Sequence, residues 1–167
     1  GEAFFEVVPD RQPFVVTTSD AEIEVLGTRF NIRSWAGDTE VAVESGRVRV
    51  RTRVSDVREV VLAGTGEAVR VEDDSLLVQH PAMLDYVLAW RRRAFAAVDR
   101  PLGTILQDVE RLYGLTVDVD EGLALQDSMT LLYGPNTPPE SILHDICLAR
   151  DCRYRRTSRG FALFSAR

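Results

Sequence analysis

Histidine is the first residue type to test for chemistry, because it acts as a general base and as a metal ligand near neutral pH. The chain has two histidines, His80 and His144, and they fall in different halves of the sequence. A zinc site or a Ser/His/Asp arrangement needs histidine beside its partners. We therefore predict no catalytic residue and no metal site at either position.

An acidic stretch, DVDEGLALQD, is the next candidate, because carboxylates at alternate positions can bind calcium. A calcium loop that starts at Asp118 has Asp120 in place, but Leu123 stands where glycine is required and Met129 where a bidentate glutamate is required. The alternation instead predicts Asp118 and Asp120 on the solvent side of a strand. None of the motifs GxGxxG, GxxxxGK[ST] and GxSxG occurs, so we predict no cofactor.

The two cysteines, Cys147 and Cys152, lie five residues apart across the predicted end of a helix. A disulfide there would fasten the helix to the strand that follows, as occurs in an oxidising compartment. Cys147 also falls on an apolar stripe, so the alternative is two small buried hydrophobic residues. The sequence leaves both interpretations open.

The only run of three consecutive basic residues is in WRRRAF, with Arg91, Arg92 and Arg93. The net charge of the chain is -6. A nucleic-acid-binding surface needs a basic stripe, so we predict no nucleic-acid partner. The arginine cluster is interpreted as a solvated linker face, with a contact to a protein partner as the alternative.

The elements that must position these residues differ between the halves of the 167-residue chain. In the first half, apolar residues occupy odd positions up to Val25 and even positions from Leu26 onward, which predicts a bulge or corner at Leu26-Gly27. The same change recurs around Gly46 and Gly64, where Ser45-Gly46 is interpreted as a hairpin loop. Residues 1–80 are therefore predicted to be an all-β domain of antiparallel stacked hairpins.

The second half changes to a helical period. Residues 81–93 are predicted to be a helical linker whose apolar face holds Met83, Tyr86, Val87 and Trp90. Residues 102–113 follow the helical rule and end at Gly114, a typical helix-terminating glycine. With a second helix near 138–150, residues 94–167 are predicted to be a small α+β domain of order β-α-β-β-α-β-β on one sheet.

Four segments of the first half, GEAFFEVVPDRQPFVV, EVLGTRFNIRSW, VAVESGRVRV and VLAGTGEAVRV, resemble the extracytoplasmic region of FecR-family sigma-factor regulators. The second half, from Trp90 through RPLGTILQDVERLYGLTVDV, resembles the secretin and TonB short N-terminal domain that follows it in such proteins. The resemblance implies the periplasmic part of a single-pass inner-membrane protein of a Gram-negative bacterium. It also implies that a cytoplasmic sigma-binding part, a membrane helix and the first β-strands precede Gly1.

The resemblance further implies a partner, the N-terminal signalling domain of a TonB-dependent outer-membrane transducer, with the sigma factor and the membrane reached only through the preceding parts. We expect the transducer to dock on an edge strand of the second domain, either SMTLLY or GFALF, or on a helix face. The corresponding candidate partner-binding residues are Met129, Leu131, Tyr133, Phe161 and Leu163. The alternatives are a structural component of a secretin or other envelope channel and, third, an enzyme or carbohydrate-binding module.

Overall fold

The chain divides into two units, Gly1–Val87 and Leu88–Arg167. The structure, a computed structural model, describes residues 1–35, 37–53, 57–72, 75–79 and 84–166. The division falls within the segment 81–93 that the sequence predicts as a helical linker. That segment contains a short helix, α1 (Leu84–Val87), and a 3-10 turn, η1 (Ala89–Arg92). Met83 and His80 lie outside the described residues.

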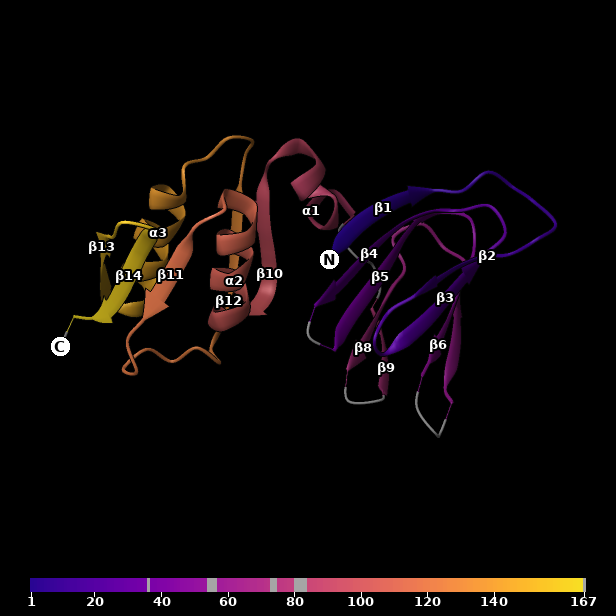
Figure 1. The fold of residues 1–167 in the computed structure, drawn as a ribbon, viewed down its shortest axis with the longest axis horizontal. Coiled ribbons are helices and arrows are strands. Elements are labelled where there is room, and N and C mark those ends of the chain that lie inside the picture. Colours follow the sequence, from indigo (N-terminus) through magenta and orange to yellow (C-terminus); the bar gives the residue numbers. More distant parts are fainter. Residues whose placement is uncertain (36, 54–56, 73–74, 80–83, 167) are drawn as a thin grey trace. The chain divides into compact units, whose positions relative to one another are not determined.

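The first unit is a sandwich of two antiparallel sheets (Figure 1). One sheet has the order β1 (Glu2–Glu6), β4 (Arg29–Trp35), β5 (Asp38–Ser45), β8 (Ala68–Glu72) and β9 (Ser75–Gln79). The other has the order β2 (Phe14–Thr17), β3 (Ala21–Val25), β6 (Val48–Thr52) and β7 (Glu59–Leu62). Hairpins alternate between the sheets along the chain, because β2 pairs with β3, β4 with β5, β6 with β7 and β8 with β9.

The changes of phase in the sequence are the places where the chain crosses from one sheet to the other. Gly27 lies between β3 and β4, Gly46 between β5 and β6, and Gly64 between β7 and β8, and none of these consecutive strands pair. Crossing the sandwich reverses the side that faces the core, so the apolar positions must shift by one residue. The predicted corner at Leu26-Gly27 is confirmed. The hairpin predicted at Ser45-Gly46 is wrong, because the hairpins lie between the glycines.

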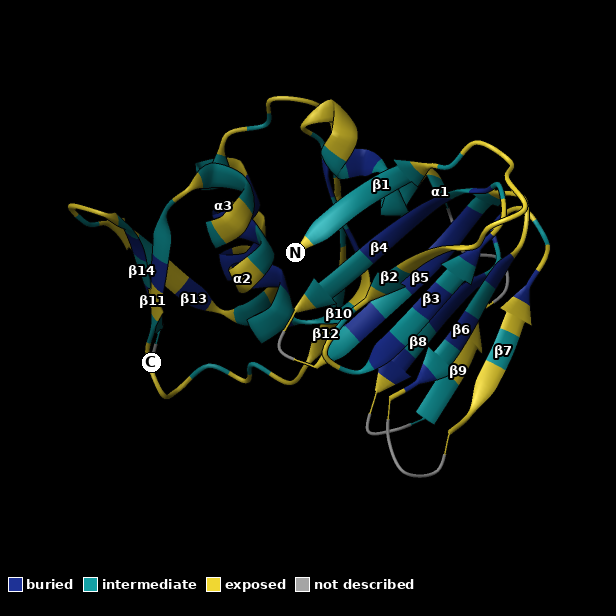
Figure 2. Cartoon of the chain, turned by 45° about the vertical axis from the view of Figure 1, so that its right-hand side comes forward, coloured by how far each residue is buried: buried dark blue, intermediate teal, exposed yellow. Residues whose placement is uncertain are grey.

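The core of the first unit is made by the inward faces of both sheets (Figure 2). Phe30 is fully buried and stacks on Phe5 with ring centroids 5.2 Å apart. Leu26, which the alternation places on the buried side, is instead 54% exposed, because it lies in the crossing and not in a strand. In the four-stranded sheet the buried residues alternate along β3, where Ala21, Ile23 and Val25 are buried, and β6 shows the same alternation.

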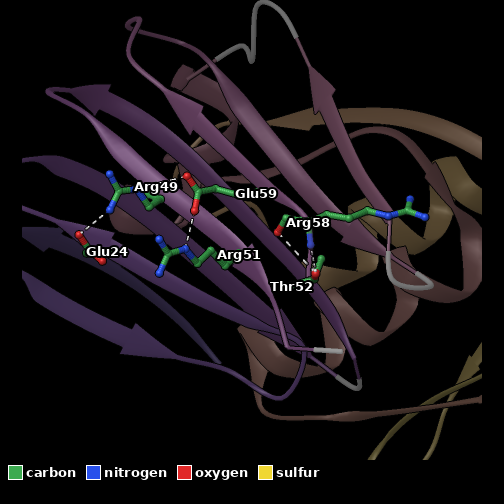
Figure 3. A network of polar contacts seen from close by, with 6 residues as sticks. All are labelled: Glu24, Arg49, Arg51, Thr52, Arg58 and Glu59. Atoms are coloured by element: carbon green, nitrogen blue, oxygen red, sulfur yellow. Dashed lines mark hydrogen bonds and ion pairs between the residues drawn. The ribbon is translucent and has the colours of Figure 1, made fainter. Parts of the chain in front are cut away.

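The solvent face of the four-stranded sheet is covered by a ladder of opposite charges (Figure 3). Arg49 on β6 forms a salt bridge with Glu24 on β3, with Nη1 3.0 Å from Oε1. Arg51 on β6 forms one with Glu59 on β7, with Nε 2.5 Å from Oε2. The hydrogen bond from Arg51 lowers the pKa of Glu59. Cross-strand pairs of opposite charge favour this register over its alternatives, but exposed pairs contribute little to stability. We interpret the ladder as structural.

The second unit contains two helices and two small sheets. Its elements follow in the order β10 (Phe95–Pro101), α2 (Leu102–Tyr113), β11 (Thr116–Val119), β12 (Ser128–Tyr133), α3 (Pro139–Arg150), β13 (Cys152–Arg156) and β14 (Gly160–Ser165). One sheet pairs β10 with β12, and the other has the order β11-β14-β13 with β11 parallel to β14. The single small sheet expected from the sequence is therefore wrong, and the helices lie between the two sheets (Figures 1 and 2).

This sandwiched position explains why each helix buries so much of its surface. In α2, Leu102, Ile105, Leu106 and Val109 are buried, and the helix ends at Gly114 in the left-handed conformation, as predicted. In α3, the buried residues are Ile142, Leu143, Ile146 and Cys147. Burying a large apolar side chain contributes roughly 1.5–3 kcal/mol. The helices thus join both sheets into one core.

Candidate functional site

The candidate site is a strand edge in the second unit, and the structure distinguishes sharply between the two strands expected to provide it. β14 (GFALF) pairs with β11 on one side and β13 on the other, so it is a central strand. Phe161 and Leu163 are 3% and 1% exposed and belong to the core. The prediction that GFALF is an edge strand is wrong, because a single sequence does not reveal the order of strands in a sheet. Phe161 and Leu163 therefore lack the exposure that a partner contact at an edge requires.

The strand β12 (SMTLLY) is an edge strand, since β10 is its one neighbour among the described strands. Met129, Leu131 and Tyr133, the other candidate contacts, are partly buried and pack against the core. The alternating period places the residues between them on the opposite face. Ser128, Thr130 and Leu132 are exposed there, with Leu132 46% exposed. The edge is therefore available through its backbone and its outer face, not through the three candidate side chains.

Both ends of β12 are fastened to α3. At the end of the strand, the Tyr133 hydroxyl donates to Asp145 Oδ2 at 2.6 Å. At its start, Arg150 Nη1 donates to Asp127 Oδ2 at 2.9 Å and Arg150 Nη2 donates to the Ser128 carbonyl at 2.7 Å. A strand with one strand neighbour loses half of the usual ladder of hydrogen bonds. These contacts hold the edge in place before any partner binds, which reduces the ordering cost of binding.

The contact with Asp145 affects the pKa of the Tyr133 hydroxyl. Burial, together with the hydrogen bond and the charge of Asp145, raises the pKa of Tyr133 well above the usual value for tyrosine. Because the folded state disfavours the phenolate, the contact stabilises the fold below about pH 10, the pKa of free tyrosine. That contribution is lost as the pH rises through the raised pKa.

An alkaline titration followed by ultraviolet difference spectroscopy tests this description. We expect Tyr133 to ionise late, so that Tyr133→Phe removes one phenolate from the most alkaline part of the curve. Asp145→Asn should shift the late part toward lower pH, because the amide keeps an acceptor but removes the negative charge. A Tyr133→Phe curve that loses its phenolate in the range of free tyrosine would contradict the predicted contact.

The two cysteines form a disulfide, which resolves the alternatives left by the sequence. Cys147 near the end of α3 is bonded to Cys152 at the start of β13, with the Cα atoms 4.4 Å apart. Both residues are also buried, so the bond lies within the core. It closes a short turn in which Asp151 adopts a left-handed conformation. The bond fixes the exit of α3, the helix that holds β12.

Reduction should destabilise the second unit. For a loop this short, the chain-entropy model gives a contribution of about 2 kcal/mol. The Trp35→Phe variant leaves Trp90, in the second unit, as the tryptophan that reports its unfolding. We expect dithiothreitol to lower the denaturation midpoint of this variant and to have no effect once both cysteines are replaced by alanine. Equal midpoints with and without reductant in the cysteine-containing protein would overturn the assignment.

The other sequence candidates lie apart from this edge. His144 is exposed on α3, and Asp118 and Asp120 are exposed at β11, as the strand interpretation predicts. Within the described ranges, no three His, Cys, Asp or Glu side chains gather as a possible metal site. In the same ranges, no helix has the length and apolar character needed to cross a membrane.

Comparison with known proteins agrees with this architecture. Residues 1–49 match the family model described as "FecR protein". Two crystal structures, at 2.50 and 1.65 Å resolution, of a "putative anti-sigma factor" from Parabacteroides distasonis ATCC 8503 superpose with a TM-score of 0.87 and 26% identity. The match covers 99% of this chain and 77% of that one, so it includes both units. Residues 1–49 are thus similar to the FecR family, and both units share the fold of the anti-sigma factor structures.

This family and fold are those of sigma-factor regulators, which are regulatory proteins anchored in a membrane. No protein of curated function matched the chain. For a FecR regulator, the site to look for is therefore a surface that contacts a sigma factor or a receptor. The exposed edge at β12 is our candidate for such a surface.

Proposed function

We propose that this region is the periplasmic signalling part of its FecR regulator, and that it receives its signal from a TonB-dependent outer-membrane transducer. The N-terminal signalling domain of the transducer docks on β12 and adds a strand to it. The signal then passes through the membrane to an extracytoplasmic-function sigma factor. Support for a periplasmic location comes from the disulfide between Cys147 and Cys152, since disulfides persist in oxidising compartments.

The observation that carries the proposal is an exposed edge strand without charged side chains. β12 consists of Ser, Met, Thr, Leu, Leu and Tyr, whereas exposed edges in soluble proteins are commonly protected by charges or proline. An unprotected edge of this kind favours addition of a partner strand, in which main-chain hydrogen bonds provide affinity. Leu132 on the outer face offers an apolar contact beside that new strand.

The test is calorimetric titration of the whole chain with the signalling domain of the transducer encoded beside it. We expect saturable one-to-one binding that Leu132→Arg weakens by at least about tenfold, or 1.4 kcal/mol, because a charge replaces an apolar contact at the interface. Val61→Arg is the matched control, since Val61 is 44% exposed on β7 of the first unit and adds the same charge outside the second unit. Absence of binding, or equal loss in both variants, would contradict the proposal.

A further inference from the structure

A second edge in the second unit differs from β12 in its charge. β13 forms one side of the three-stranded sheet, with β14 as its one neighbour among the described strands. Its sequence is CRYRR, and a further arginine, Arg159, follows in the turn. Arg153, Arg155, Arg156 and Arg159 are all exposed. The edge therefore carries four positive charges within seven residues of a chain whose net charge is -6.

Most of these charges have no ion-pair partner among the residues that the structure describes. Arg156 contacts Glu140 of α3 at 3.4 Å and lies over the ring of Phe161. Among the described residues, no carboxylate pairs with Arg153, Arg155 or Arg159. The first unit shows the opposite arrangement, with its solvent-facing arginines Arg49 and Arg51 paired to glutamates on neighbouring strands (Figure 3). Within the described part of the chain, Arg153 and Arg155 thus remain available for carboxylates of another molecule.

The backbone of β13 also presents hydrogen-bonding groups on the side away from β14. The Ala166 N–H donates to the Asp151 carbonyl at 3.1 Å, and the Thr157 N–H donates to the Gly160 carbonyl at 2.8 Å. Hydrogen-bonded pairs alternate in an antiparallel ladder, so these two bonds fix the phase of the whole strand. Arg153 and Arg155 therefore form hydrogen-bonded pairs with Phe164 and Ala162 of β14. Tyr154, which lies between them, directs its N–H and C=O groups away from β14.

The same phase fixes where carboxylates of an added strand would lie. Arg153 and Arg155 are two residues apart, so they share the outer face of the sheet. In an added antiparallel strand, the residues opposite them would form non-hydrogen-bonded pairs, in which side chains approach most closely. On the same face, Ala162, Phe164 and Arg155 line a shallow depression with Asp118 on its far side. An incoming carboxylate is attracted to the β13 side and repelled from the Asp118 side.

We propose that β13 binds an extended acidic segment of a partner protein as an additional strand, with Asp or Glu at alternate positions facing Arg153 and Arg155. The proposal does not depend on the transducer or on β12. Charged residues on an edge also prevent sheets from associating with each other. If the arginines only prevent association of sheets, no partner strand is required and no peptide should bind. A binding measurement therefore separates the two explanations.

The probe is a fluorescent peptide of alternating threonine and glutamate, titrated with the whole chain at an ionic strength of about 0.15 M, where the Debye length is about 8 Å, and followed by anisotropy. We expect Arg153→Glu/Arg155→Glu to weaken its binding by at least about tenfold, because both charge pairs become repulsive. The matched control is Arg11→Glu/Arg47→Glu, which changes the net charge equally at two exposed positions of the first unit. It should change the affinity by less than about threefold, since neither residue belongs to the β13 edge and screening weakens charges that do not contact the peptide.

A second peptide separates strand addition from charge attraction. The same acidic sequence, N-methylated at alternate residues, keeps every carboxylate but cannot complete the ladder. The proposal requires that this peptide lose most of its binding. Equal binding of both peptides would overturn it, as would equal weakening by the control variant. Binding to vesicles of anionic lipid that competes with the peptide, and that N-methylation leaves unaffected, would assign the arginines to a membrane surface instead.

Discussion

Gly160→Ala is expected to unfold the second unit or to lower its free energy of unfolding by at least about 4 kcal/mol, a range reached only by severe packing and backbone defects. Gly160 begins β14 and lies opposite Thr116 of β11 in the parallel pair. A Cβ atom at Gly160 would lie 2.0 Å from the Thr116 carbonyl oxygen and 2.7 Å from its nitrogen. Both are backbone atoms, so a side-chain rotation cannot relieve the contact.

The strands themselves would have to separate. Moving β11 away from β14 breaks the pairing of Val117 with Phe161, and both side chains belong to the core. A unit of this size has a small margin of stability, because small domains bury a lower fraction of their surface. The loss of one strand pair therefore removes most of the available stability.

The measurement uses denaturant unfolding in the Trp35→Phe background, where Trp90 reports on the second unit. Gly134→Ala is the matched control, because a Cβ atom there meets nothing within 4 Å. We expect the control to change the free energy of unfolding by less than about 0.5 kcal/mol. Ordinary surface changes alter the free energy of unfolding by less than about 1 kcal/mol. If Gly160→Ala also changes it by less than about 1 kcal/mol, β11 and β14 do not approach each other as closely as described.

Sequence patterns predict the elements of this fold better than their arrangement. The helix over 102–113 and its end at Gly114 follow from apolar spacing and from glycine, both local signals. The crossing at Leu26-Gly27 follows from alternation, which is also local. The same signal at Ser45-Gly46 is ambiguous, because a hairpin within one sheet and a crossing between two sheets both permit a change of phase. Strand partners far apart in sequence decide between them.

The candidate site shows the same limit. Alternation correctly places Met129, Leu131 and Tyr133 on one face of a strand, but that face packs against the core. The order β11-β14-β13 makes the C-terminal strand central, which no local pattern indicates. One signal for the basic edge was present in the sequence, namely the run of arginines from Arg153 to Arg159 beside the disulfide. It becomes an edge only through the position of β13 in its sheet.

Gly46→Ala is expected to lower the free energy of unfolding of the first unit by about 3 kcal/mol, as a left-handed backbone and a steric contact combine. Gly46 has φ of +98°, a conformation that residues with a side chain rarely adopt. A Cβ atom there would also lie 2.8 Å from the Gly27 carbonyl oxygen and 2.8 Å from Thr28 Oγ1. Two crossings between the sheets therefore meet at this point. Thr28 fixes their contact, because its hydroxyl donates to the Arg47 carbonyl at 2.8 Å.

The backbone strain and the contact can be measured separately. Gly37 has φ of +84°, but a Cβ atom there meets nothing within 4 Å, so Gly37→Ala introduces the strain alone. We expect it to cost about 1 kcal/mol. Unfolding is followed in the Trp90→Phe background, where Trp35 reports on the first unit. If the crossings pack against each other as described, Gly46→Ala must cost more than Gly37→Ala. Equal costs would mean that φ alone requires glycine at position 46, and that the two crossings do not support each other.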